Sequence, residues 1–402
     1  MRRPTGIGLA ALLALSLLAL GPATATPATP TATPAAPVPL LAYYYIWFDT
    51  RSWDRAKDDV PELGRYSSDD PAVMARHVEW ARRAGIDGFI VSWKSTPTLN
   101  RRLEQLARIA SANRFKLVLI YEGLDFHRNP LPVEQIGRDL AEAADRYTRA
   151  PAFQLFDRPL VIWSGTWRFS RAEIARVVQP LRDRLLILAS EKDPAGVRRL
   201  AGLVDGDAYY WSSADPLATP GYREKLAAME RTVHGQGGRW IAPAAPGFDA
   251  RKVGGTRVVD RRDGATLAAS LGAATASAPD AVGLISWNEF SESSYVEPSR
   301  RYGRRYLDVL ASVARPPAPE TTTRTTAGHA PTTDPETAPR TGPGAAPEAA
   351  PATDPAIDFA SDEPAGRDDG PGRLLLVGAL LVAGLGSLGV LAWRAGRRRT
   401  RA

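Results

Sequence analysis

Cysteine is absent from this chain of 402 residues. Its absence excludes disulfide bonds, thiolate nucleophiles and zinc sites built on thiolates. Histidine is also scarce, and the four positions (His77, His127, His234 and His329) show no metal-ligand spacing. We therefore expect neither a bound metal ion nor any other cofactor.

Several catalytic and binding signatures are missing too. The sequence has no Gly-x-Ser-x-Gly motif and no phosphate-binding loop, and no Gly-x-Gly-x-x-Gly follows the first predicted strand. The formal net charge of +7 and the pI near 9.7 would suit a nucleic-acid-binding protein. Much of the positive excess lies in the two termini, however, so we predict no nucleic-acid partner.

The N-terminus reads MRRPTGIGLAALLALSLLALGPATA. Its two arginines, an apolar run over residues 7–20 and the triplet Ala23-Thr24-Ala25 predict a secretory signal peptide over residues 1–25. The apolar run is short for a membrane-spanning helix, although an uncleaved anchor is the alternative interpretation. Export without disulfides suits a bacterial envelope better than a eukaryotic cell surface.

A second apolar segment lies near the C-terminus. Residues 374–393 carry no charge and match the length needed to cross a bilayer, and the basic tail RAGRRRTRA follows at residues 394–402. This predicts a single-pass type I protein of the cell membrane, with the folded part extracellular, a transmembrane helix and a cytoplasmic tail. A buried core helix is the alternative.

Two segments rich in proline and threonine flank the remaining chain. Residues 26–38 and residues 315–372 contain too little apolar surface to offset the entropy lost on ordering. We predict a spacer in the first and a disordered stalk in the second. Residues 39–314 are left as the folded domain.

Eight short apolar or aromatic runs alternate with eight helical patterns in this domain. The predicted strands cover residues 40–47, 88–93, 116–121, 159–163, 185–190, 207–211, 239–244 and 282–287. The predicted helices cover residues 70–85, 98–113, 133–147, 171–181, 195–203, 222–233, 265–276 and 302–313, and Asp69 or Asp70 is expected to cap the first. This order predicts an α/β fold, a single (β/α)8 TIM barrel. A doubly wound open sheet is the alternative.

In a barrel of this kind the functional groups lie at the carboxyl ends of the strands. Those ends are rich here in aromatic and acidic residues, which suit a glycan because its C–H faces stack on rings and its hydroxyls bind carboxylates and amides. The residues predicted to bind such a substrate are Tyr44, Tyr45, Trp47, Trp93, Tyr121, Glu122, Tyr210, Trp211, Trp287, Asn288, Tyr295 and Glu297.

Two further carboxylates are the candidate catalytic residues. Glu289 and Glu292 follow directly after the last predicted strand, in ISWNEFSESSYVEPS (residues 285–299). A spacing of three usually means two solvated charges on a helix, but surface sequence is not expected immediately behind a buried strand. Glycoside hydrolysis needs one carboxylic acid to protonate the leaving oxygen and a second carboxylate as base or nucleophile. We predict a glycoside hydrolase.

The same residues resemble a known family. SWNEFSESSYVEPSRRYG (residues 286–303) is similar to the Trp/Phe-Asn-Glu-Trp-x-Glu-Gly-x-x-x-Glu-Pro signature of the glycoside hydrolase family 99 endo-α-mannosidases and of the related WbsX-like proteins of polysaccharide gene clusters. AYYYIWFD (residues 42–49) and AGIDGFIVSWKS (residues 84–95) resemble the family's first two strands. APAAPGFDARKVGG (residues 242–255) resembles its Pro-Gly-Tyr-Asp segment.

This resemblance implies specific roles. Glu292 would be the general acid/base at the glycosidic oxygen. Glu289 would deprotonate the 2-hydroxyl of the sugar, which then attacks its own anomeric carbon through an epoxide-like intermediate with net retention. Asn288 would orient the pair. The chain departs from the family where Phe290, Ser291, Glu292 and Ser293 replace the frequent order Trp, His, Glu, Gly.

The expected function is thus a membrane-anchored extracellular enzyme that cleaves an α-linked polysaccharide or envelope glycan. Two alternatives belong to other classes. A non-catalytic glycan-binding barrel would use the same cleft but has no need of two such glutamates. A WbsX-like role in polysaccharide biosynthesis fits poorly with a domain outside the cell, where nucleotide sugars are scarce.

Overall fold

The computed structural model describes residues 37–314, with the exception of residues 55, 56 and 126. The predicted signal peptide, nearly all of the spacer, the stalk, the transmembrane helix and the basic tail lie outside these residues. Within the described part of the chain, no helix combines the length and the apolar composition needed to cross a membrane.

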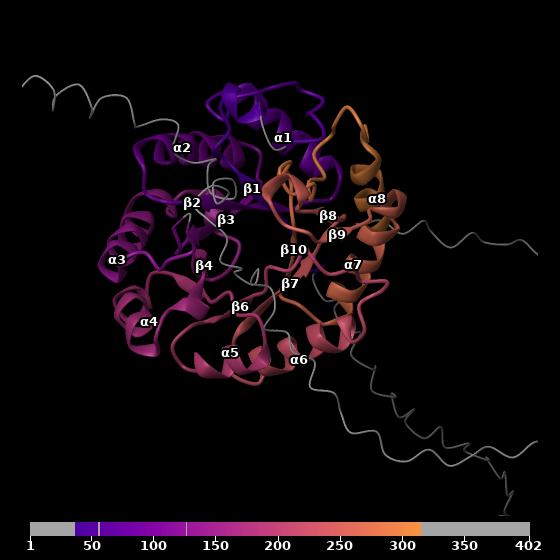
Figure 1. Ribbon diagram of the computed structural model, residues 1–402. Coiled ribbons are helices and arrows are strands. Elements are labelled where there is room, and N and C mark those ends of the chain that lie inside the picture. The colour runs from indigo at the N-terminus through magenta and orange to yellow at the C-terminus, as the bar shows by residue number, and fades with distance from the viewer. Residues whose placement is uncertain (1–36, 55–56, 126, 315–402) are drawn as a thin grey trace, which may run out of the picture. The chain divides into compact units, whose positions relative to one another are not determined.

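Eight parallel strands form a nearly closed barrel (Figure 1). They are β1 (Leu40–Tyr45), β2 (Gly88–Trp93), β3 (Lys116–Glu122), β4 (Leu160–Ser164), β5 (Leu186–Leu188), β6 (Gly206–Ala208), β7 (Arg239–Ala244) and β10 (Ala281–Leu284). Hydrogen-bonded neighbours follow the order β5-β4-β3-β2-β1-β10-β7-β6, and a parallel bridge between Ala189 and Asp207 connects the two ends. The predicted barrel is therefore confirmed.

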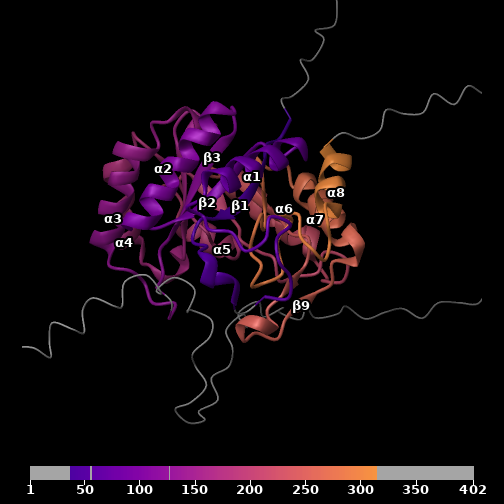
Figure 2. The same ribbon diagram turned by 90° about the horizontal axis from the view of Figure 1, so that it is seen from above.

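α-Helices follow the barrel strands and surround them as a ring (Figures 1 and 2). They are α1 (Pro71–Arg83), α2 (Pro97–Ala112), α3 (Val133–Glu142), α4 (Arg171–Val178), α5 (Pro194–Arg199), α6 (Tyr222–His234), α7 (Ala265–Ala276) and α8 (Arg305–Ala314). α5 is shorter than predicted. The short strands β8 (Phe248–Asp249) and β9 (Val258–Val259) form an antiparallel pair after β7 that the sequence did not predict.

The start of α1 shows why helices begin where they do. The Asp70 side chain accepts a hydrogen bond from the backbone N–H of Ala72 at 2.8 Å, and Pro71 occupies the first helical turn. Asp70 is therefore the cap, and Asp69 has a different role. Its carboxylate pairs at 2.6 Å with Arg102, whose side chain is almost completely buried, and this contact joins α1 to α2.

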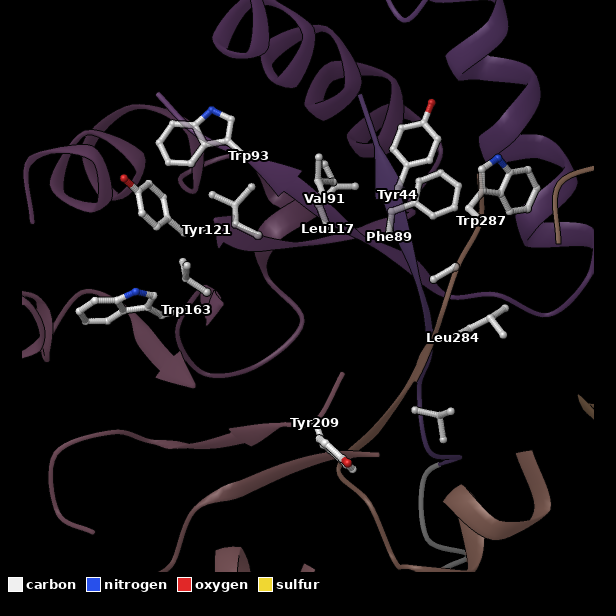
Figure 3. Packing of buried hydrophobic residues seen from close by; sticks show 14 of the residues in the cluster. Tyr44, Phe89, Val91, Trp93, Leu117, Tyr121, Trp163, Tyr209, Leu284 and Trp287 are labelled. Atoms are coloured by element: carbon white, nitrogen blue, oxygen red, sulfur yellow. The ribbon is translucent and has the colours of Figure 1, made fainter. Parts of the chain in front are cut away.

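Alternation along the strands divides the core into two layers. On β1, Leu41 and Tyr43 point into the barrel, whereas Ala42 and Tyr44 point outward and pack under the helices. Figure 3 shows the outer layer, in which Tyr44 stacks on Phe89 with ring centres 4.4 Å apart. The parity of a residue on its strand therefore decides whether it faces the barrel interior or the helices.

Candidate active site

Polar side chains point inward where the strands end at the mouth of the barrel. Tyr45 and Ser92 are register partners on β1 and β2, and Glu122 and Ser164 are partners on β3 and β4. The Ser92 hydroxyl donates to Glu122 at 2.9 Å. The hydroxyls of Tyr45 and Tyr210 lie 2.8 Å apart. These groups provide hydrogen-bonding partners that can meet several hydroxyls of a sugar at once.

The loop after β10 carries both candidate catalytic carboxylates. The side chain of Asn288 binds it to β1, since it accepts from the backbone N–H of Tyr45 and donates to the carbonyl of Tyr45, each at 2.9 Å. The backbone N–H of Glu289 donates to the Ser286 hydroxyl at 2.7 Å. The carbonyl of Glu292 accepts from the N–H of Asp249 on β8 at 2.7 Å. The loop that carries the two glutamates is therefore held on one side by β1 and on the other by the segment that follows β7.

The environments of the two carboxylates differ. Burial, together with the negative charge of Glu289, raises the pKa of Glu292 to about 8, and the Arg128 guanidinium opposes this shift. Burial also raises the pKa of Glu289, but the backbone N–H of Ser291 and the charge of Lys57 stabilise its ionised form. At neutral pH, Glu292 therefore holds a proton while the contacts of Glu289 favour a carboxylate. This is the division of roles that an acid and a base require.

Tyrosine hydroxyls lie close to both carboxylates. Burial raises the pKa of Tyr45 and of Tyr210 well above the usual value, and the charges of Glu289 and Glu292 raise both further. The two hydroxyls thus remain neutral and can donate hydrogen bonds at neutral pH. Trp47 packs against Tyr45 with ring centres 4.3 Å apart and is half-buried. Tyr45, Trp47, Tyr210 and Glu122 therefore lie where they were predicted to lie, at the mouth.

Three predicted binding residues instead support the loop. Asn288 is fully buried, as described above. Tyr295 stacks on Phe290 with ring centres 3.9 Å apart and donates to Asp59 at 2.7 Å. Glu297 is buried and accepts from the hydroxyl of Tyr66 at 3.0 Å. These side chains are engaged within the protein and position the loop beneath the carboxylates.

Glu297 also belongs to a buried chain of polar groups that reaches α1. His77 lies between Glu297, whose Oε1 is 3.0 Å from Nε2, and Tyr44, whose hydroxyl is 3.0 Å from Nδ1. All three side chains are inaccessible to solvent or nearly so. Tyr66 extends the chain to Asn288 at 3.2 Å. The last segment of the site loop is thus fixed to the first helix of the barrel.

Five of the predicted binding residues are not at the mouth, and this corrects the sequence interpretation. Each belongs to the outer core layer and packs under the helices, where a ligand in the barrel mouth cannot touch it. For Tyr44, Trp93 and Tyr121 the physical reason is the two-residue alternation of strands, which turns every second side chain away from the interior. The other two follow the ends of β6 and β10, where the chain has left the strand. These residues are Tyr44, Trp93, Tyr121, Trp211 and Trp287.

Some residues of the site were not predicted. Ser92 lies inward on β2 beside Glu122, and strict alternation from Ile90 would have indicated it. Lys57 comes from the loop after β1, its ammonium 3.4 Å from the Ser291 hydroxyl, and no local signal marks it. Among the described residues, no group of three or more His, Asp or Glu side chains has the arrangement of a metal site.

Ser293 has a left-handed backbone conformation, with φ of +50°. This is the position at which the resembled family often has glycine, the residue that adopts such a φ without steric cost. The carbonyl of Ser293 accepts from Arg261 at 2.7 Å, and Arg261 also donates to the carbonyl of Tyr295 at 2.8 Å. The arginine therefore holds the strained turn that follows Glu292.

This turn leads to a stability prediction. Replacing Ser293 by valine should lower the free energy of unfolding by about 1–2 kcal/mol, because a β-branched residue is disfavoured at positive φ. Replacing it by glycine should cause no loss. Urea unfolding followed by tryptophan fluorescence would measure both. Equal stability of the valine and glycine variants would show that the turn relaxes to another conformation.

A parallel barrel with a protonated and an ionisable carboxyl group among tyrosines at its mouth has the arrangement of a glycoside hydrolase. The comparisons with known proteins agree with this at the level of the fold. No family model and no curated protein matches the chain.

Solved structures do match it. A GH99 endo-α-mannosidase from Bacteroides thetaiotaomicron, in complex with bis-tris propane, aligns with a TM-score of 0.60 and 19% identity over 68% of this chain and 96% of that chain. Another structure of the endo-α-mannosidase from this organism aligns with a TM-score of 0.60 and 18% identity, over 68% of this chain and 95% of that chain. A glycoside hydrolase-like protein aligns with a TM-score of 0.55 and 16% identity, over 71% of this chain and 97% of that chain. The predicted resemblance to the GH99 family is thus confirmed for the fold of the barrel.

Proposed function

We propose that this chain is a retaining glycoside hydrolase that cleaves an α-linked polysaccharide or an envelope glycan, as an endo-α-mannosidase does. The observation that carries the proposal is the pair Glu289 and Glu292 on one loop, with the pKa of Glu292 raised by burial and by its neighbour. The likeness of the barrel to structures of endo-α-mannosidases supports it.

In the proposed reaction Glu292 donates its proton to the glycosidic oxygen as the bond to the anomeric carbon breaks. Glu289 accepts the proton of the 2-hydroxyl, and the 2-oxygen attacks the anomeric carbon to give a 1,2-anhydro sugar. Water then attacks the same carbon and gives its proton to Glu292, while the 2-oxygen regains its proton from Glu289. Two inversions give net retention, and both carboxyl groups return to their starting states.

The neutral tyrosine pair complements this reaction. The hydroxyls of Tyr45 and Tyr210 can donate hydrogen bonds to ring substituents of the sugar, and Glu122 can accept them from across the mouth. Lys57 stabilises the ionised form of Glu289 before the reaction. We further propose, from the terminal segments of the sequence, that the enzyme is anchored in the cell membrane with the barrel outside.

Incubation of the full-length protein with a panel of α-mannans, α-glucans and envelope glycans tests the proposal. Release of reducing ends by the wild type and by Glu134→Gln, an exposed α3 variant, but not by Glu292→Gln, is the expected result. If no member of a broad panel is cleaved while one is bound, the chain is a glycan-binding barrel instead.

Stability should depend on pH through Glu292. Its pKa is raised in the folded chain relative to the ordinary value of 4.5, so the folded state binds more protons than the unfolded state between about pH 5 and 8. Raising the pH through this window therefore destabilises the wild type. The free energy of unfolding of Glu292→Gln, relative to that of the wild type, should therefore increase by about 2 kcal/mol from pH 5 to pH 8. This value follows from the shift in the pKa of Glu292, reduced because its side chain is partly exposed.

Urea unfolding of the wild type, Glu292→Gln and Glu134→Gln at the two pH values would measure this gain. Glu134 is exposed on α3, so its variant should follow the wild type at both. A difference between wild type and Glu292→Gln that is the same at pH 5 and pH 8 would contradict the assigned pKa shift.

A further inference from the structure

Two cations flank one tryptophan on the side of the barrel mouth formed by the loops after β3, β4 and β5. Trp167 is half-buried in the short 3-10 helix Thr166–Arg168 that follows β4. The Lys192 ammonium lies 4.7 Å from its ring centre and the Arg128 guanidinium 6.0 Å. Both cations are exposed. Within the described ranges of the chain, neither forms an ion pair with a carboxylate, so their charge is available to a ligand.

The loops that carry Trp167 and Lys192 are fixed to each other. Arg199 donates to the carbonyls of Thr166 at 3.1 Å and Phe169 at 2.8 Å, on either side of the tryptophan. It also pairs at 3.0 Å with Glu191, which is buried and directly precedes Lys192. An arginine that spans two loops in this way restricts their relative movement, so Trp167 and Lys192 keep their separation.

The loop that carries Arg128 is fixed to the same unit. Leu124 packs against Gly165, which has φ of +89° and where an added Cβ would lie 2.6 Å from the leucine Cγ. The carbonyl of Leu124 accepts from the Lys94 ammonium at 2.7 Å. Asp125 accepts from the backbone N–H groups of His127 and Asn129, each at 2.8 Å, and so orders the turn around Arg128.

This basic site lies at the same end of the barrel as the carboxylate pair, because all of these residues follow the carboxyl ends of barrel strands. The positive charge of Arg128 also acts to lower the pKa of Glu292, the proposed acid. The tryptophan ring orients the cations by cation–π attraction but leaves their formal charge unneutralised. A pre-positioned guanidinium and ammonium bind carboxylate, phosphate and sulfate oxygens through charge-assisted hydrogen bonds.

We infer that Arg128, Lys192 and Trp167 form a subsite for an anionic group of the glycan, so that the substrate is an acidic polysaccharide bearing uronate, phosphate or sulfate. This inference rests on the proposed function, because it names the substrate class of the same site. It explains why the barrel mouth carries two exposed cations in addition to the two glutamates. The glutamates alone would be sufficient for the cleavage of a neutral sugar. The subsite would hold a sugar unit next to the one that is cleaved.

Matched glycans that differ only in charge test this inference. One pair is oligogalacturonate and its methyl ester, and the other is phosphomannan oligosaccharide and its dephosphorylated form. Binding to the full-length Glu292→Gln protein, which should not turn them over, would be measured by calorimetry at low and high salt. The same measurement would be made on a triple variant in which Arg128→Gln and Lys192→Gln are combined with Glu292→Gln. The control is a triple variant that combines Arg108→Gln and Arg231→Gln with Glu292→Gln and so loses the same amount of exposed charge.

We expect one charged glycan to bind about tenfold more tightly than its neutral partner, with a preference that salt weakens. The Arg128→Gln and Lys192→Gln changes should abolish this preference, and the control changes should not. A preference for oligogalacturonate over its methyl ester would identify the bound group as a carboxylate, and a preference for the phosphomannan oligosaccharide over its dephosphorylated form would identify it as a phosphate.

Other outcomes separate this inference from the proposed function. Equal binding of charged and neutral partners, together with Glu292-dependent cleavage of a neutral glycan by the otherwise unchanged chain, would overturn the acidic subsite and leave the hydrolase intact. An unchanged preference after removal of both cations would also overturn it. Absence of both binding and cleavage across the panel would overturn the proposed function itself.

Discussion

Replacing Glu292 by glutamine should lower kcat on a polymeric glycan by about three orders of magnitude, with little change in KM. Protonation of the leaving oxygen by a positioned acid contributes roughly 10²–10⁴-fold, and the amide cannot supply that proton. Glutamine keeps the size of the side chain, and the loop is held by other groups, among them Asn288 and Arg261. The loss should therefore appear in turnover rather than in binding.

A substrate with a good leaving group makes this test specific. An aryl glycoside of an acidic phenol, or a glycosyl fluoride, leaves without protonation, so Glu292→Gln should recover much of the lost rate of the bond-breaking step on it, while its attack by water still lacks the base. Glu289→Gln should be impaired on both kinds of substrate, because Glu289 serves the attack on the anomeric carbon. Initial rates on both substrates would be compared with those of Glu134→Gln. If Glu292→Gln cleaved the polymer at nearly the wild-type rate, the assignment of Glu292 as the general acid would be wrong.

The second large effect is expected at a residue that does not touch substrate. Replacing His77 by leucine should lower the free energy of unfolding by about 3 kcal/mol. The change leaves the Glu297 carboxylate buried without its imidazole partner, and it removes the partner of the Tyr44 hydroxyl. Breaking a buried ionisable pair from one side is costly, since the remaining charge is neither hydrated nor paired.

A double-mutant cycle separates this effect from loss of packing. The variant His77→Leu with Glu297→Gln removes the unpaired charge, so it should be more stable than His77→Leu alone. Unfolding by urea, followed by tryptophan fluorescence, gives all the free energies required. A loss below about 1 kcal/mol in His77→Leu would mean that water reaches Glu297, and that the connection between α1 and the site loop is weak.

The site is assembled from segments that are distant in the sequence. The loop after β10 is tied to β1 through Asn288, to β8 through the carbonyl of Glu292, and to α1 through Glu297 and His77. Each tie uses a backbone group or a buried side chain rather than an exposed ion pair. Such contacts tolerate salt, and they keep Glu292 in the environment that raises its pKa.

Much of the fold could be predicted because each element has a local signal. The run KLVLIY predicted a buried strand at residues 116–121, and β3 covers Lys116–Glu122. Leu99, Leu103, Leu106 and Ile109 predicted one face of a helix, and in α2 the three leucines are buried while Ile109 is half-buried. The weak pattern at residues 195–203 predicted a helix that the structure shortens to Pro194–Arg199. Strong periodicity thus gave accurate bounds for β3 and α2, whereas the strands predicted at residues 207–211 and 282–287 end earlier in the structure, at Ala208 and Leu284.

The candidate site was only partly predictable. Glu289 and Glu292 were identified because acidic residues directly after a buried strand lie at the barrel mouth. The aromatic residues beside them were chosen by their place at strand ends without regard to parity, so Tyr44 and Trp93 were assigned to a site that they turn away from. Lys57 could not be found at all, since its approach to Ser291 depends on how the loop after β1 folds back.

The sequence by itself determined the order and type of the elements, and with them the barrel, because strand and helix periodicities are local and repeat eight times. It also determined which two carboxylates stand at the end of the last strand. Only the tertiary structure decided that desolvation raises the pKa of both carboxyl groups, that of Glu292 to about 8, and that Arg128, Trp167 and Lys192 meet. Those properties depend on closure of the barrel, which sets burial and brings charges from distant loops within range of one another.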